Sequence, residues 1–388
     1  MDLRRLIRDT GCRLLRGDAL TEITCVCCDS RSAEPGALFV CLPGRRTDGS
    51  VYAAQAAAAG AAAVLCAPGY TGSDLPDRCA VLQADDPRRM MAVLSARLYG
   101  DPGGRMTLVG ITGTNGKTSS TYLLKTVLEK TLNAKVGLIG TIQNMIGDEI
   151  IETERTTPES FELQKLFYEM KQAGCTHVVM EVSSHALALR RTAGLWFQAG
   201  IFTNLTRDHL DFHGTMEAYR KAKGLLFQQC QTGIFNLDDG AGRQFAQTAP
   251  CQAVTFGETQ GQAQVLAREI RLYPDRVSFQ VHWPQGSCPV TLPIPGRFTV
   301  YNALGVLACC LALGLPMDQA AGALAQIPGG QGPGGGGAGA GALHGAHRLR
   351  PYSGRPGEGP HRRPGRDPVP AAVPVRLRRG PGPDQGAL

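Results

Sequence analysis

The chain has 388 residues, of which 43% are hydrophobic and 19% charged, so it has the composition of a globular protein and the length of two or three domains. Its net charge of +7 does not indicate a nucleic-acid partner, because residues 329–388 hold nine arginines against three acidic residues and the rest of the chain is close to neutral. Residues 1–16 are too charged for a signal peptide, and no run approaches the roughly 18 apolar residues of a membrane span, so we expect a cytoplasmic protein without a membrane partner.

Residues 1–104 are predicted to form a small α/β domain that ends in the compact linker Asp101-Pro-Gly-Gly104. Cys25, Cys27 and Cys28 lie close together, but no matching pair of cysteines or histidines follows at zinc spacing. We therefore interpret the 13 cysteines of the chain as reduced thiols. The predicted strands are residues 23–27, 37–41, 62–66 and 81–83, and the predicted helices are residues 52–59 and 88–98.

Residues 107–118 predict a phosphate-binding loop. An apolar run at 108–111 is typical of a buried strand, and the loop Gly113-Thr-Asn-Gly-Lys-Thr118 leads into a helix that starts at Ser119. Glycines let backbone N–H groups approach phosphate oxygens, and the helix N-terminus adds a favourable dipole. Lys117 would then reach the β- and γ-phosphates, and the Thr118 hydroxyl would bind Mg²⁺. Ile111 stands where the common pattern has another glycine, and the alternative is a glycine-rich turn without a ligand.

Residues 105–328 alternate between strand and helix patterns, which predicts a mainly parallel sheet covered by helices on both faces. The predicted fold class is therefore α/β, with a small N-terminal domain and a central domain of the P-loop type. After the loop, the predicted strands are residues 135–139, 177–181, 199–202, 232–236 and 253–256, the helices are residues 160–173, 216–228 and 300–313, and residues 268–280 with the run before Pro293 form an added hairpin.

Polar residues follow two of these strands, and in open α/β sheets ligands bind at the carboxyl ends of strands. Glu181 could hold the same Mg²⁺ as Thr118, or it could be a solvated cap. Residues 204–213 contain two Asp, two His and an Asn, which suits either a hard cation or a polar loop that caps the next helix at Met216. Lys223 and its neighbour Lys221 lie within that helix, and either could be an ordinary solvated lysine.

Thr156-Thr157-Pro158-Glu159 precedes another predicted helix. A proline in the first turn with hydroxyls before it makes an N-terminus that could bind an anion, although ordinary capping explains the pattern as well.

Taken together, these motifs resemble the Mur ligases over roughly residues 20–328. The motifs Gly113-Thr-Asn-Gly-Lys-Thr118, Thr156-Thr-Pro158, Glu181-Val-Ser-Ser-His-Ala-Leu187, Asn204-Leu-Thr-Arg-Asp-His-Leu-Asp211 and Pro295-Gly-Arg-Phe-x-x-x-Asn302 occur in the order seen in that family. The resemblance implies a monomeric, ATP- and Mg²⁺-dependent ligase that adds a diamino acid to UDP-MurNAc-L-Ala-D-Glu in peptidoglycan synthesis. In such enzymes the glutamyl carboxylate attacks the γ-phosphate, and the amine then attacks the acyl phosphate.

The resemblance also implies roles for individual residues. Lys117, Lys223 and His209 match catalytic positions, and Lys223 matches a lysine that the family carbamylates. The nucleotide would contact Gly113, Thr114, Asn115, Gly116, Lys117, Thr118, Ser119 and Asn302. The UDP-linked precursor would contact Ser30, Thr156, Thr157, Ser183 and Arg191, and the metal ligands would be Thr118, Glu181, His209 and carbamylated Lys223.

Residues 329–388 depart from the family, whose third domain closes over ATP and selects the incoming amino acid. With 17 Gly and 10 Pro they show no periodic apolar pattern, so we expect disorder. Back-translation of residues 348–358 with a one-base shift can give D-Y-A-H-T-P-D-A-L-E-K, which resembles the start of that domain. We interpret the tail as a frameshifted third domain, which would impair activity and hide the choice between diaminopimelate and lysine. The alternatives are a non-catalytic binding remnant and another Mur-type or folylpolyglutamate-type ligase.

Overall fold

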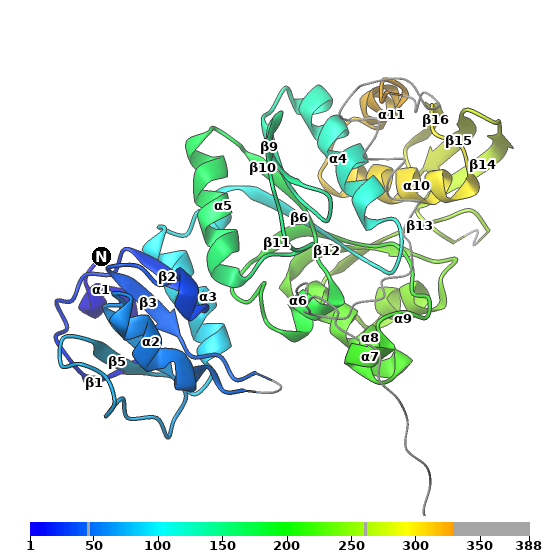
Figure 1. The fold of residues 1–388 in the computed structure, drawn as a ribbon. Coiled ribbons are helices and arrows are strands. Elements are labelled where there is room, and N and C mark those ends of the chain that lie inside the picture. Colours follow the sequence, from blue (N-terminus) through cyan, green and yellow to red (C-terminus); the bar gives the residue numbers. More distant parts are fainter. Residues whose placement is uncertain (45–46, 260–261, 329–388) are drawn as a thin grey trace, which may run out of the picture. The chain divides into compact units, whose positions relative to one another are not determined.

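The computed structural model describes residues 1–44, 47–259 and 262–328. These residues form two separate β-sheets, a five-stranded sheet near the N-terminus and an eleven-stranded sheet in the centre of the chain (Figure 1). The predicted disorder and frameshift of residues 329–388 lie outside the described residues. The predicted domain boundary between residues 104 and 105 falls within a short 3₁₀ helix, η3 (Gly103–Arg105), before the second sheet, and the division into domains stays a prediction.

The N-terminal sheet has the strand order β1-β5-β4-β3-β2, in which β2 to β5 are parallel and β1 is antiparallel. Helix α3 begins where Asp86 accepts a hydrogen bond from the N–H of Arg89 and Pro87 takes the first helical position. The predicted elements are present, and the sequence missed α1 and β1. The elements are α1 (Leu3–Ile7), β1 (Arg13–Arg16), β2 (Cys25–Cys27), η1 (Ser30–Ser32), β3 (Ala37–Val40), η2 (Gly49–Tyr52), α2 (Ala53–Ala58), β4 (Ala63–Cys66), β5 (Ala80–Gln83) and α3 (Pro87–Leu98).

The central sheet has the strand order β16-β15-β14-β13-β12-β11-β6-β10-β7-β8-β9. The seven strands from β14 to β7 in this order run parallel, so the predicted mainly parallel sheet is confirmed. The strands are β6 (Thr107–Thr112), β7 (Val136–Ile139), β8 (Asn144–Ile146), β9 (Glu149–Ile151), β10 (His177–Glu181), β11 (Phe197–Phe202), β12 (Cys230–Asn236), β13 (Gln252–Gly257), β14 (Val265–Leu272), β15 (Val277–Trp283) and β16 (Gly286–Leu292).

Helices cover both faces of this sheet. Alternate residues of β6 point to opposite faces, so Val109 and Ile111 pack with α4, α10 and α11, whereas Leu108 packs with α5, η4 and α9. The helices are η3 (Gly103–Arg105), α4 (Lys117–Leu132), α5 (Ser160–Gln172), α6 (Ser184–Ala188), α7 (Leu210–His213), α8 (Met216–Gly224), η4 (Leu225–Gln229), α9 (Gly240–Thr248), α10 (Arg297–Ala312) and α11 (Met317–Ala325).

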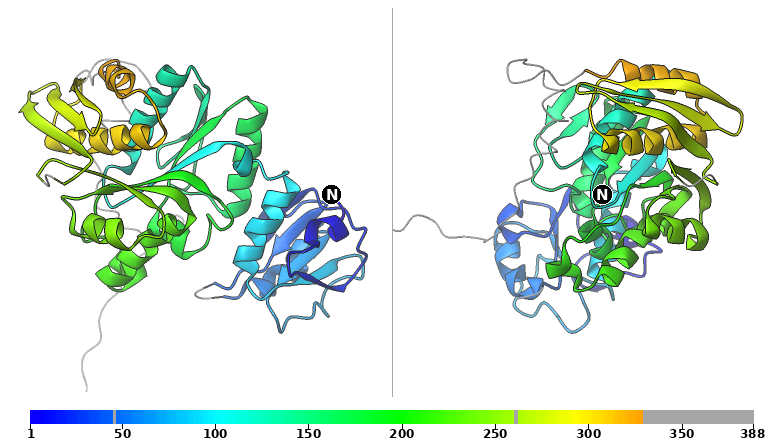
Figure 2. Two further views of the ribbon diagram at one scale, coloured as in Figure 1. Left: turned by 180° about the vertical axis from the view of Figure 1, so that it is seen from behind. Right: turned by 90° about the vertical axis from the view of Figure 1, so that its right-hand side faces the viewer.

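One end of the central sheet and one helix differ from the sequence prediction. The predicted hairpin is a three-stranded antiparallel extension, β14-β15-β16, on which α10 and α11 pack (Figure 2). The predicted helix at 216–228 divides into α8 and the 3₁₀ helix η4. Among the described residues, no helix is both long and apolar enough to cross a membrane.

Candidate active site

The loop between β6 and α4 lies at the carboxyl end of the central strand, where the chain needs glycine at two positions. Gly113 has φ +151° and Gly116 has φ +86°, which L side chains rarely adopt. A β-carbon at Gly113 would collide with Thr203, and one at Gly116 would collide with Asn302. Both glycines therefore let the loop approach neighbouring elements closely, and Asn302 on α10 lies against the loop, as a nucleotide contact would require.

Helix α4 begins at Lys117, two residues earlier than predicted. The first N–H groups of a helix have no partner within it, so the N–H groups of Lys117, Thr118 and Ser119 are available at the mouth of the loop. Ser119 is buried, whereas Asn115 is exposed at the tip. This start places the loop and the positive end of the helix dipole together, which is the arrangement that binds phosphate.

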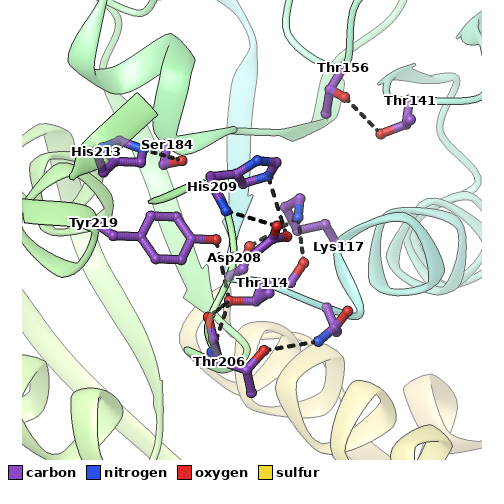
Figure 3. Close-up of polar contacts among 12 residues, drawn as sticks. Thr114, Lys117, Thr141, Thr156, Ser184, Thr206, Asp208, His209, His213 and Tyr219 are labelled. Atoms are coloured by element: carbon purple, nitrogen blue, oxygen red, sulfur yellow. Dashed lines mark hydrogen bonds and ion pairs between the residues drawn. The ribbon is translucent and has the colours of Figure 1, made fainter. Parts of the chain in front are cut away.

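The segment after β11 braces the loop. Asn204 accepts hydrogen bonds from the N–H of Thr114 through its carbonyl and from the N–H of Asn115 through Oδ1, both at 2.9 Å. Thr203 Oγ1 donates to the Asn115 carbonyl at 2.7 Å, and Thr206 N donates to Thr114 Oγ1 at 3.0 Å (Figure 3). The sequence analysis offered a cation site or a helix cap here and missed this bracing, although β11 lies beside β6.

Two lysines converge on the carbonyl of Gly113. Lys117 Nζ donates to it at 2.9 Å and also to the Thr114 carbonyl at 2.9 Å, and Lys223 Nζ donates to Gly113 O at 2.7 Å. Lys223 is 1% exposed and its ammonium lies 4.4 Å from the centre of the Tyr219 ring. The suggestion that Lys223 is a solvated lysine is therefore wrong, whereas Lys221 is exposed and pairs with a surface carboxylate.

The charge of both converging lysines is disfavoured by their surroundings. Burial lowers the pKa of Lys117, although the nearby carboxylates Glu181 and Asp208 oppose this. Burial also lowers the pKa of Lys223 well below its ordinary value, and the charge of Lys117 adds to the effect. These surroundings make the Lys223 amine easier to deprotonate than that of a surface lysine.

Glu181 is fully buried at the end of β10, so its interpretation as a solvated cap is wrong. Its Oε1 accepts from Thr118 Oγ1 and from the N–H of Thr141, both at 2.9 Å, and Oε2 accepts from Thr141 Oγ1 at 3.0 Å. Thr141 Oγ1 also lies 3.0 Å from Thr156 Oγ1 (Figure 3). Thr141 was missed by the sequence analysis, although it follows β7 at the same edge of the sheet.

The contact between Thr118 and Glu181 fits Mg²⁺, because a hydroxyl and a carboxylate oxygen are ligands that this hard cation prefers. Within the described part of the chain, no group of three or more His, Cys, Asp or Glu side chains could hold a metal ion. A magnesium ion at this place would therefore depend on phosphate or water oxygens for its remaining ligands.

His209 belongs to a cluster of rings beside the loop. Its backbone has φ +51°, and its Nε2 lies 3.5 Å from Asp208 Oδ2. The ring of His185 packs edge-on against His209 at 4.9 Å. Figure 3 shows His213, whose Nε2 lies 2.9 Å from Ser184 Oγ. Burial, together with the neighbouring histidines, lowers the pKa of His185 to about 4. The cluster holds His209 at the edge of the site.

The candidate precursor contacts in the central sheet meet at Thr157. Thr157 Oγ1 donates to the Glu181 carbonyl at 2.9 Å and accepts from the N–H of Ser183 at 3.1 Å. Arg191 Nη1 donates to the Thr157 carbonyl at 2.9 Å. Ser30 lies in the N-terminal sheet region, where its Oγ donates to Gln55 Oε1 at 3.0 Å. The structure thus brings Thr157, Ser183 and Arg191 together and describes Ser30 with its own sheet.

A glycine loop at the end of a central parallel strand, followed by a lysine, a threonine and a buried glutamate, defines a phosphate-binding α/β protein. Residues 22–98 match the Mur ligase family catalytic domain, and residues 111–310 match the Mur ligase middle domain. The second match covers more than half of the chain, so the chain belongs to the Mur ligase family.

Several relatives are ligases with the same name. The chain is 42% identical over 332 residues to UDP-N-acetylmuramoyl-L-alanyl-D-glutamate–2,6-diaminopimelate ligase 1 of Clostridium acetobutylicum, which covers 85% of this chain and 68% of the relative. It is 43% identical to the corresponding ligase of Caldanaerobacter subterraneus, over 81% of this chain and 64% of the relative. A solved structure of a ligase of this name is 26% identical with a TM-score of 0.71, over 80% of this chain and 64% of that chain. The chain spans about two thirds of the length of these relatives.

Proposed function

We propose that this chain binds ATP, Mg²⁺ and UDP-MurNAc-L-Ala-D-Glu, and that its complete form joins a diamino acid to this precursor in peptidoglycan synthesis. Following the names of its relatives, we propose 2,6-diaminopimelate as the diamino acid. The observation that carries the proposal is the position of Glu181. Its carboxylate contacts Thr118 of the phosphate loop, and its carbonyl accepts a hydrogen bond from Thr157 among the candidate precursor contacts. One residue therefore links the two candidate binding sites.

Transfer of a phosphoryl group to a carboxylate requires residues that bind the triphosphate and residues that bind the carboxylate. Lys117 and the N-terminus of α4 would bind the triphosphate, and Arg191 would hold the precursor's carboxylate end. Thr118 and Glu181 would hold Mg²⁺, which would neutralise negative charge on the phosphates. Positioning of this kind is worth about 7–11 kcal/mol of barrier in favourable cases.

Lys223 is the remaining candidate catalytic residue. Its lowered pKa means that the neutral amine is more populated near neutral pH than in a surface lysine. The neutral amine is the form that reacts with carbon dioxide, which supports the proposed carbamylation. His209 is proposed to act at the same side of the loop.

A second candidate function is that of a non-catalytic protein that binds nucleotide and precursor. It is favoured by the contacts of Glu181, which join the phosphate loop to the candidate precursor contacts and require binding alone. In either case we propose a monomer in the cytoplasm, where ATP and UDP-linked precursors are available, without nucleic-acid or membrane partners.

Calorimetric titration of the purified 388-residue protein with a non-hydrolysable ATP analogue and with UDP-MurNAc-L-Ala-D-Glu tests both candidates. We expect each ligand to saturate one site per chain, with tighter binding of the analogue when Mg²⁺ is present. Absence of precursor binding would contradict both functions. Precursor binding without nucleotide binding would contradict the assignment of the loop between β6 and α4.

A further inference from the structure

Glu159 is a buried carboxylate whose role none of the site assignments above explains. It lies immediately before α5, is 7% exposed, and its Oε1 lies 2.8 Å from Nη2 of Arg191, which follows α6. The side chains of the pair are 9% and 14% exposed. A mostly buried ion pair between residues far apart in the chain fixes the position of both side chains, unlike an exposed pair on the protein surface.

The guanidinium of Arg191 is held at two of its three nitrogen atoms. Nη2 faces Glu159, and Nη1 donates to the Thr157 carbonyl at 2.9 Å. The third nitrogen, Nε, is buried and has no hydrogen-bond acceptor among the described residues. A buried donor without an acceptor costs about 1–3 kcal/mol, so this N–H favours a ligand that brings an acceptor oxygen to it.

Glu159 pairs the charge of the Arg191 guanidinium and restricts its side chain to one rotamer. Without Glu159, a mostly buried guanidinium would carry an unpaired charge and would be free to change rotamer. Ordering a long side chain on binding costs about 0.5–1.5 kcal/mol, and a partner that orders it beforehand removes that cost from the binding step. Since Glu159 neutralises Arg191 without occupying Nε, it orders the guanidinium and leaves the Nε–H for the ligand.

We propose that Glu159 is a positioning residue, which holds Arg191 so that its Nε–H receives a carboxylate of the D-glutamyl end of the precursor; this inference rests on the proposed function. The competing explanation is structural. Glu159 also accepts from a backbone N–H in the first turn of α5, while Glu162 Oε2 accepts from the Glu159 N–H at 2.7 Å, which together form a capping box.

The chain offers a matched control, because Glu162 belongs to the same capping box without contacting Arg191. We would compare Glu159→Ala, Glu159→Gln and Glu162→Ala by calorimetric titration of the 388-residue protein. The probes are UDP-MurNAc-L-Ala-D-Glu and UDP-MurNAc-L-Ala, which lacks the glutamyl carboxylates. Thermal melting of each variant separates loss of the helix cap from loss of binding.

We expect Glu159→Ala to weaken binding of the dipeptide precursor up to about tenfold, the cost of ordering one long side chain, and to leave binding of UDP-MurNAc-L-Ala unchanged. Glu159→Gln keeps an acceptor oxygen and should bind the precursor more tightly than Glu159→Ala. Glu162→Ala should lower the melting temperature without selective loss of the dipeptide precursor. If Glu159→Ala weakens both probes equally, or Glu162→Ala reproduces its selectivity, Glu159 is only a helix cap.

A double-mutant cycle with Arg191→Ala completes the test. If Glu159 acts through Arg191, the second substitution adds no further loss of precursor binding to Arg191→Ala. Additive losses would overturn the inference, as would unchanged precursor binding by Arg191→Ala. If the unsubstituted protein binds neither probe, the proposed function itself fails. This outcome differs from failure of the inference about Glu159, which appears only when the variants are compared with an unsubstituted protein that binds the precursor.

Discussion

Lys117 forms two hydrogen bonds to carbonyls of its own loop, at 2.9 Å each, and is half-buried. A nucleotide would exchange these neutral acceptors for phosphate oxygens, and hydrogen bonds to charged groups contribute about 1.5–3 kcal/mol each. We expect Lys117→Ala to weaken binding of the ATP analogue by at least about tenfold while the protein remains folded.

The matched control for this substitution is Lys130→Ala. Lys130 lies on the same helix and donates to Gln326 at 2.9 Å at the far end of α4. Its loss should leave nucleotide affinity unchanged in the same titration. Equal affinity of the Lys117→Ala variant and the unsubstituted protein would remove the phosphate role of Lys117.

His185 gives the protein a predictable response to acid. Its pKa in the folded protein is about 4, below the ordinary 6.5, mainly because of burial. On acidification the unfolded chain therefore binds a proton first, and the stability present above pH 6.5 is lost as the pH falls towards 4. We expect His185→Gln to show a flatter dependence of the unfolding free energy on pH in this window.

Denaturant unfolding at several pH values between 4 and 6.5 measures this difference. The control is His282→Gln, because His282 is exposed on β15, away from the histidine cluster. If the unfolding free energies of His185→Gln and the unsubstituted protein depend on pH in the same way, burial of the His185 imidazole does not lower its pKa.

At the scale of elements, the loop between β6 and α4 depends on the backbone of Gly116. Alanine at φ +86° costs about 1–2 kcal/mol of stability from the backbone alone, and here its β-carbon would also displace Asn302. Gly174, between α5 and β10, has φ +84° and open space around it. It therefore provides a control with the same backbone cost and no neighbour.

We expect Gly174→Ala to lower the unfolding free energy by about 1–2 kcal/mol, and Gly116→Ala to lower it by more, because its β-carbon also displaces Asn302. Only Gly116→Ala should weaken binding of the ATP analogue, because only it moves Asn302 and reshapes the loop. Chemical denaturation and nucleotide titration of both variants check this. Normal nucleotide affinity of Gly116→Ala would mean that the loop tolerates a side chain and that its shape does not bind phosphate.

Elements with a strong period were predictable, and those defined by tertiary contacts were not. The strand His177–Glu181 was predicted with its correct bounds because it is a continuous apolar run that is buried on both faces. Strand β1 was missed because its residues are exposed or half-exposed and its position depends on pairing with β5. Helix α7 has only four residues, too few for a periodic pattern.

The candidate site shows the same division. The phosphate-binding loop with Lys117 and Thr118 could be predicted from the local order of residues. The position of Glu181 at the carboxyl end of a strand could be predicted from the strand pattern. The ion pair of Glu159 with Arg191 could not be predicted, since the two residues are far apart in the sequence and meet only in the folded chain.

At the scale of the whole molecule, both family matches lie within residues 22–310, and the chain spans about two thirds of the length of its relatives. We predict that re-sequencing the gene around the codons for residues 327–331 will reveal a one-base shift, since residues 348–358 can be back-translated in another frame to a stretch that resembles the start of the family's third domain. If re-sequencing confirms the reading frame through residue 388, the frameshift is contradicted and the gene encodes residues 329–388 as they stand.

A ligase assay tests the central claim most directly. Purified 388-residue protein and a variant whose frame is restored after Pro328 would each receive ATP, Mg²⁺, UDP-MurNAc-L-Ala-D-Glu and 2,6-diaminopimelate, and the amide product would be measured by mass spectrometry. We expect the restored chain to form UDP-MurNAc-tripeptide with release of ADP and phosphate, and the 388-residue chain to bind the precursor without detectable turnover. An inactive restored chain that binds neither ATP nor the precursor would contradict the proposed function, and equal rates for the two chains would show that residues 329–388 are no defect.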